Sequence, residues 1–158
     1  MAMASELRKQ DGLARLVKGL VGRWKVELTI RNPDGSIVGG KGDLEAESIS
    51  GGHGVHSMMN VELKGMGLYE EQVLWGYDQK RNEISNLSVT SDGRVLYHNG
   101  IWKDDTTMEL RSAGLEKGGE PSEHITISLV SPTEVRGNIV VSVDNQTITR
   151  LDYVLNRV

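Results

Sequence analysis

Turn signals recur at nearly regular intervals along most of this chain. Nine short clusters rich in Gly, Pro, Asp, Asn and Ser separate segments in which apolar and polar residues alternate. This period of two is the pattern of a β-strand. The predicted strands cover about 24–31, 37–50, 55–63, 68–77, 83–90, 94–102, 106–112, 123–130, 134–143 and 146–156. Short connections between neighbours favour an antiparallel meander, because parallel strands need long crossovers.

Strands that follow one another in this way constrain the architecture. An open sheet of ten strands would leave two exposed edges, and closing the sheet removes both of them. We therefore expect a mainly β protein, an up-and-down antiparallel β-barrel of about ten strands over residues 23–157. A barrel of this size is wide enough to enclose a small ligand.

A single helix is predicted before the first strand, over residues 5–20. Ser5 can serve as its N-cap, and the apolar residues recur at helical spacing. They are Leu13, Leu16, Val17 and Leu20. The apolar face of this helix could seal one end of the barrel or meet a second copy, so a homodimer is possible. We expect helix and barrel to form one domain, 1–158.

Composition excludes several classes of function. The chain has no cysteine, which rules out disulfides, thiolate metal sites and a cysteine nucleophile. Its net charge of -4 and the lack of a basic cluster interleaved with aromatics argue against nucleic acid as a partner. No apolar run approaches the roughly 20 residues of a membrane span. Charged residues interrupt the first 20 residues, unlike a signal peptide, so we expect a cytoplasmic protein.

The motif Gly22-Arg23-Trp24 opens the first predicted strand directly after the helix. It resembles the Gly-x-Trp signature of the calycin barrels, which include lipocalins and fatty-acid-binding proteins. Further motifs at 67–71, 74–78, 100–102 and 149–153 extend the similarity. Over residues 13–158 the chain resembles an uncharacterised bacterial family of one-domain, lipocalin-like barrels.

This resemblance implies that a late arginine, Arg150 or Arg157, covers the ring of Trp24. Fatty-acid-binding proteins also hold a carboxylate with a late Arg-x-Tyr pair. Here Arg150 and Tyr153 are three apart, which places them on opposite faces of a strand unless a bulge intervenes. The chain thus departs from a simple fatty-acid carrier. Some calycins bind haem through a histidine near the C-terminus, but no histidine follows His124, and we expect no cofactor.

One predicted strand carries a row of aromatic side chains interrupted by a carboxylate. Its members on one face are Tyr69, Glu71, Val73, Trp75 and Tyr77. Such a row can form the wall of a ligand cavity, in which Glu71 is a polar anchor or a general base. The alternative is a packed core strip with Glu71 exposed near one end.

Histidines supply the other ionisable candidates. His98 shares one strand face with Trp102, and a histidine inside a barrel titrates near neutrality. The alternative is a structural or outward-facing His98. His53 and His56 flank a glycine-rich turn at a spacing that could reach one metal, but nothing nearby completes the set of ligands. We expect an exposed pair there and no metal.

These observations lead to one functional hypothesis and one alternative. The hypothesis is binding of a small apolar or amphipathic molecule in the barrel, with an adaptable thioether on the lined face. The predicted ligand-binding residues are Met59, Tyr69, Glu71, Val73, Trp75, Tyr77, His98, Trp102 and Arg150. The alternative is an enzyme, a cyclase, isomerase or hydratase acting on a hydrophobic metabolite, with His98, Glu71 or Tyr77 as acid or base. Strand alternation leaves open which face points inward.

Overall fold

A helix followed by ten strands makes up the fold. The computed structural model describes residues 2–113 and 119–158, with the backbone alone for residues 2–10. The elements are α1 (Ala2–Leu20), β1 (Gly22–Arg31), β2 (Ile37–Ile49), the 3-10 turn η1 (Ser50–Gly52), β3 (Gly54–Leu63), β4 (Gly67–Asp78), β5 (Glu83–Thr90), β6 (Val95–Trp102), β7 (Thr107–Ser112), β8 (Ser122–Ser131), β9 (Glu134–Val143) and β10 (Gln146–Arg157).

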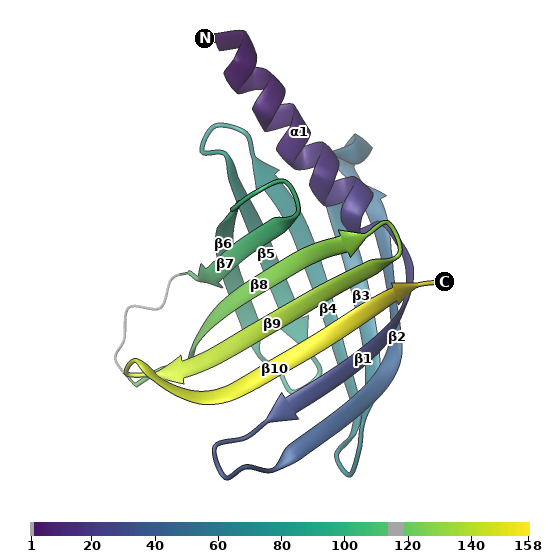
Figure 1. Cartoon of the computed structure of the whole chain (residues 1–158), viewed down its shortest axis with the longest axis vertical. Helices are drawn as coiled ribbons and strands as arrows, with labels where there is room; N and C mark the ends of the chain where they lie inside the picture. The colour runs from purple at the N-terminus through teal and green to yellow at the C-terminus, as the bar shows by residue number, and fades with distance from the viewer. Residues whose placement is uncertain (1, 114–118) are drawn as a thin grey trace.

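The strands close into a barrel, which confirms the predicted fold. Each strand pairs antiparallel with the next along the chain, and β1 also pairs with β10, so the sheet has no open edge. Figure 1 shows the helix lying across one end of this barrel. We call this the helix end and the opposite end, where β3 turns into β4 and β5 into β6, the far end. The helix begins at Ala2, before the predicted N-cap Ser5.

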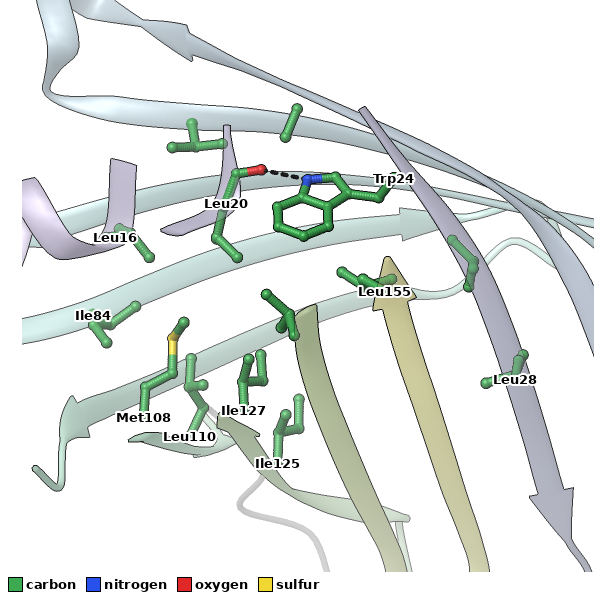
Figure 2. Close-up of a cluster of buried hydrophobic side chains, with 14 of the residues drawn as sticks. Leu16, Leu20, Trp24, Leu28, Ile84, Met108, Leu110, Ile125, Ile127 and Leu155 are labelled. Carbon is green, nitrogen blue, oxygen red and sulfur yellow. Dashed lines mark hydrogen bonds between the residues drawn. The ribbon is translucent and has the colours of Figure 1, made fainter. Parts of the chain in front are cut away.

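Alternation along β1 identifies the inward face. Trp24, Val26 and Leu28 are buried, whereas Lys25 and Glu27 between them are exposed. The strand register carries this inward parity around the barrel, from Trp24 opposite Leu44 on β2 onward. The best-buried apolar side chains gather near the helix end, where Leu16 and Leu20 of α1 reach into the barrel (Figure 2). The helix therefore acts as a plug.

Trp24 and Arg157 close the helix end together. The indole Nε1 of Trp24 donates to the carbonyl of Leu20 at 2.9 Å, and the guanidinium of Arg157 lies 4.1 Å from the ring centroid. Arg157 also donates to the carbonyls of Val21 and Pro132. Gly22 has a φ of 140°, and a Cβ there would overlap the guanidinium. The glycine of the Gly-x-Trp motif thus makes room for this arginine.

A second cation over an indole ring fixes the middle of the helix. The Arg15 guanidinium lies 4.7 Å from the ring centroid of Trp102, whose Nε1 donates to the carbonyl of Gly12 at 3.0 Å. Leu16, on the same helix, is fully buried. Within the described part of the chain, no helix is both long and apolar enough to cross a membrane.

Candidate ligand-binding site

Two kinds of wall face each other inside the barrel. Inward side chains from β4, β5, β6 and β8 form what we call the polar wall: Tyr69, Glu71, Asn86, Ser88, Thr90, His98 and Glu123. Inward side chains from β1, β2, β3, β9 and β10 form the apolar wall: Leu28, Ile30, Leu44, Met59, Ile139, Leu151 and Tyr153. An amphipathic interior results.

His98 lies at the centre of the polar wall and is 3% exposed. Its Nδ1 is 2.9 Å from Oδ1 of Asn86 on β5, and its Nε2 is 3.0 Å from Oε2 of Glu123 on β8. Both contacts end on oxygen atoms. Asn86 and Glu123 therefore hold the imidazole ring in place from both sides.

Glu71 of β4 points into the same region. Tyr69, two residues earlier on the same face, donates its hydroxyl to Oε2 of Glu71 at 3.0 Å. Burial raises the pKa of Glu71, and the charge of Glu123 raises it further, while the Tyr69 hydrogen bond, Arg94 and His98 act against this rise. The carboxyl group is thus easier to protonate than an exposed glutamate.

The charge of Glu71 affects the pKa of tyrosines on two different strands. Burial, and after it the charge of Glu71, raises the pKa of both Tyr69 and Tyr153. Tyr153 belongs to β10, on the opposite wall from β4. Its ring lies against the backbone of Gly137, where a Cβ would overlap it. The missing side chain at Gly137 therefore lets the Tyr153 ring lie flat along the wall.

Arg94 is the basic residue at the rim of this region. It follows the turn after β5 and is exposed, with its Nε donating to Oδ2 of Asp92 at 2.9 Å. The Asp92 hydrogen bond, together with the charges of Tyr69 and Glu123, raises the pKa of Arg94 against the effect of its desolvation. A guanidinium already paired with Asp92 thus lies at the entrance.

Side chains do not fill the interior completely. Several inward side chains retain partial exposure, among them Met59, Glu71, Leu151 and Tyr153, whereas Trp24 near the helix end is almost fully buried. Because these side chains point into a closed barrel, their exposed area faces the inside rather than the outer surface. The interior is therefore tightly packed at the helix end and less tightly packed beyond it.

The structure brings most predicted ligand-binding residues to this interior. Met59, Tyr69, Glu71, Val73, Trp75 and His98 all face inward. The indole Nε1 of Trp75 donates to the hydroxyl of Ser57 at 3.3 Å. Glu71 is not exposed at a strand end and His98 does not face outward.

Three predicted residues lie elsewhere. Tyr77 and Trp102 face inward but at the helix end, where the Tyr77 hydroxyl bonds to Asn82 and its ring contacts Gly12. Tyr77 is six residues from Glu71 along β4, about 20 Å at strand spacing, so the two cannot act on one group. Arg150 is exposed on the outer face, opposite Arg31, as its spacing from Tyr153 predicts without a bulge between them. We therefore leave Tyr77, Trp102 and Arg150 out of the site.

Glu123, Asn86 and Arg94 were not predicted from the sequence. Glu123 carried a signal, because it shares the parity of Ile125 and Ile127, which places a carboxylate on an apolar strand face. Asn86 likewise shares a strand face with Ile84, which is buried. No sequence pattern pointed to Arg94, because its position near Glu71 depends on how the fold places the turn after β5.

The other histidines lie on the outside. His53 is exposed beside the carbonyl of Ser50, His56 contacts Gln72, and His124 contacts Glu109 at 2.8 Å. Among the residues that the structure describes, no group of three or more His, Asp or Glu side chains is arranged to hold a metal.

Two depressions also open on the outer surface. One, of about 480 Å³, covers the outer face of β4 and β5 and includes His56, Leu74 and Val89. The other, of about 460 Å³, lies beside the helix and includes Arg15, Tyr77 and Trp102. Glu71 and Thr90 also line the first depression, whereas neither depression includes His98 or Glu123.

Comparison with solved structures supports the barrel architecture. The S-type phycobiliprotein lyase CPES from Guillardia theta matches with a TM-score of 0.71 at 8% identity, covering 98% of this chain and 97% of that chain. Rv2717c from M. tuberculosis matches with a TM-score of 0.71 at 12% identity, covering 92% of this chain and 97% of that chain. Identities this low show a shared fold alone. No protein-family model and no curated protein matches the sequence.

Proposed function

We propose that the barrel interior binds a small amphipathic molecule. Its apolar part would lie along the apolar wall, beside Met59 and Leu151, and its polar group would meet Glu71, His98 and Glu123. The observation that carries this proposal is the pairing of a polar wall with an apolar wall across an interior that side chains do not fill completely. Ligand sites typically combine apolar lining with a few converging polar groups.

The energetic cost of the polar wall supports a functional role. Burying an ionisable group without full compensation destabilises a fold, so a core that serves stability alone excludes such groups. Glu71 has one hydrogen bond from Tyr69 and carries a raised pKa. Perturbed ionisable groups of this kind concentrate at functional sites.

Fluorescence titration with the neutral apolar dye N-phenyl-1-naphthylamine tests the proposal, after native mass spectrometry of freshly purified protein for co-purified ligand. The adjacent residues Met58 and Met59 give a matched pair, because Met58 is exposed on the outside and Met59 faces inward. Met59→Trp fills the interior and should weaken dye binding about tenfold or more. Met58→Trp should change it less than about twofold.

The fold of both variants is checked by circular dichroism, because an added indole can strain a packed site by about 1–3 kcal/mol. Equal dye binding by wild type, Met59→Trp and Met58→Trp would mean that the dye lies outside the barrel. The proposal would then fail. Saturable binding that Met59→Trp alone removes would support it.

An acid–base enzyme is the second candidate. It is favoured by the contact between His98 and Glu123 close to a carboxyl group that burial keeps protonatable. Such an arrangement can take a proton from a carbon beside a carbonyl and return one. The similar barrel described as a phycobiliprotein lyase is an enzyme by its name. Deuterium uptake beside the carbonyl of 2-decanone in D₂O, lost in His98→Gln, would support this reading, and uptake equal to buffer would reject it.

A further inference from the structure

We infer that the interior site prefers a cationic head group, a primary alkylammonium ion, over a carboxylate. This inference rests on the proposed binding function and names the chemistry of its ligand. The observation behind it is the balance of charged side chains on the polar wall, where Glu71, His98 and Glu123 face inward and His98 contacts Glu123.

Among the inward-facing side chains, carboxyl groups outnumber the basic groups that could bind an anion. Two carboxyl groups, Glu71 and Glu123, face the interior, and His98 between them already contacts Glu123. Along the described strands, inward positions carry no lysine. Arg157, inward on β10, lies at the helix end over Trp24. Neither a lysine nor Arg157 is therefore placed to neutralise a ligand carboxylate on the polar wall.

Arg94 and Arg150 do not change this balance of charge. Arg94 at the rim is paired with Asp92, so the pair carries no net charge. Arg150, which would correspond to a late anchor for a carboxylate, is exposed on the outer face. An anionic head group would thus meet two carboxyl groups without a partner of opposite charge, which is unfavourable in a partly desolvated interior.

An ammonium group fits the atoms that the walls offer. Within the described residues, the hydrogen bonds to Glu71 and to Glu123 use Oε2 of each side chain and leave Oε1 of both for a ligand. An ammonium has three donors and no acceptor, so these free carboxyl oxygens are suitable partners for it. Its alkyl chain would then lie along the apolar wall.

Bound cation and bound proton should compete at Glu71. The ionisable groups that face this carboxyl are Tyr69 on its own strand, Arg94 at the rim, His98 on β6, Glu123 on β8 and Tyr153 on β10. An ammonium placed between Glu71 and Glu123 favours the ionised form of Glu71, so binding releases its proton. Affinity for the ammonium should therefore rise as pH increases.

Three probes that share one chain of ten carbons test the inference: decylammonium, 1-decanol and decanoate. Each is used to displace N-phenyl-1-naphthylamine from the full chain at pH 7. Decylammonium should bind about tenfold or more tightly than decanoate, with decanol between them. Glu71→Gln should lower the decylammonium-to-decanol preference about tenfold, whereas Glu70→Gln, an exposed carboxyl one residue away, should leave it unchanged.

Glu123→Gln gives a second variant in case Glu71→Gln folds poorly, and it should shift the preference in the same direction. Decylammonium affinity should also rise between pH 5 and pH 8 in wild type, and rise less in Glu71→Gln. Tightest binding by decanoate or decanol, or a preference that survives both glutamate substitutions, would overturn the inference and leave the proposed function intact. Failure of all three probes to displace the dye, together with dye binding unaffected by Met59→Trp, would overturn the proposed function itself.

Discussion

Each end of the barrel has an arginine, but the two arginines lie in different surroundings. At the helix end an arginine covers a tryptophan ring, and its guanidinium also donates to Val21 and Pro132. At the far end an arginine stands at the rim, paired with Asp92. The helix end thus uses charge to close a packed core, whereas in the proposed function the charged groups of the polar wall meet a ligand.

Together with the proposed function, this difference separates stability from binding within one barrel. The buried apolar cluster that includes Leu16, Leu20 and Trp24 gathers toward the helix end. The polar wall gathers around His98 and Glu71, where hydrogen bonds replace apolar contacts. Substitutions at the helix end should therefore change unfolding, and substitutions on the walls should change binding.

The two tryptophans give the largest contrast. Trp24→Ala removes a ring that is 1% exposed and should cost about 3–5 kcal/mol of unfolding free energy. Trp75→Ala removes a ring that is partly exposed to the interior, so it should cost less and weaken dye binding. Chemical denaturation and dye titration measure both quantities. Equal losses of stability in the two variants would mean that the interior around Trp75 is as tightly packed as the helix end.

A glycine on the inner face gives the next effect. Gly137→Ala places a methyl group in the ring of Tyr153 and should destabilise the fold by about 1–3 kcal/mol. Gly39→Ala is the control, because nothing lies within 4 Å of its added Cβ. Thermal unfolding compares the two. A Gly137→Ala variant as stable as Gly39→Ala would show that Tyr153 moves aside without cost.

The pH dependence of stability should be smaller and should depend on Glu71. Its pKa is raised in the folded state above the ordinary value of 4.5. Its contribution to stability is therefore fully present below about pH 4.5 and is lost as pH rises through the folded pKa. Glu71→Gln should remove this loss, so its advantage over wild type grows with pH.

Unfolding free energies measured by denaturant from pH 4 to pH 8 check this prediction. Glu70→Gln serves as the control, since Glu70 is exposed on the outer face of the same strand. A difference between Glu71→Gln and wild type that stays constant across this range, or that shrinks as pH rises, would contradict a raised folded pKa.

The contact of the helix through Arg15 should show the smallest effect. Arg15→Gln loses the cation over the Trp102 ring and should cost about 0.5–1 kcal/mol. Lys18→Gln changes an exposed charge on the same helix and should have little effect. Melting temperatures of the two variants make the comparison, and identical values would show that the Arg15 contact adds nothing to the plug.

The strands and their inward faces were predictable because both follow from local patterns. Turn residues and period-two alternation located all ten strands, and the parity that puts Trp24 inside also puts Glu71 and His98 inside once the register is known. The Gly-x-Trp motif pointed to an arginine over Trp24, and the structure identifies it as Arg157.

The partners of these residues could not be predicted, because they lie across the barrel. Glu123 lies 3.0 Å from His98, although its strand is two positions away in the sheet. The charge of Glu71 contributes to the raised pKa of Tyr153 on the opposite wall. Such contacts depend on the tilt and stagger of the strands, which alternation along a single strand does not encode. Tyr77 was grouped with Glu71 because alternation shows that both lie on one face of the strand. It does not show how far apart they lie along the barrel axis.

Methionine methyl resonances test the central claim most directly, because adjacent residues report on the two faces of one strand. Protein labelled with ¹³C at its methionine methyls is titrated with 1-decanol and observed by NMR. Entry of the ligand into the barrel predicts a saturable shift of Met59 and contacts between its methyl group and the decanol chain, while Met58 stays unchanged. A shift of Met58 with an unchanged Met59 would place the ligand on the outer surface and contradict the account.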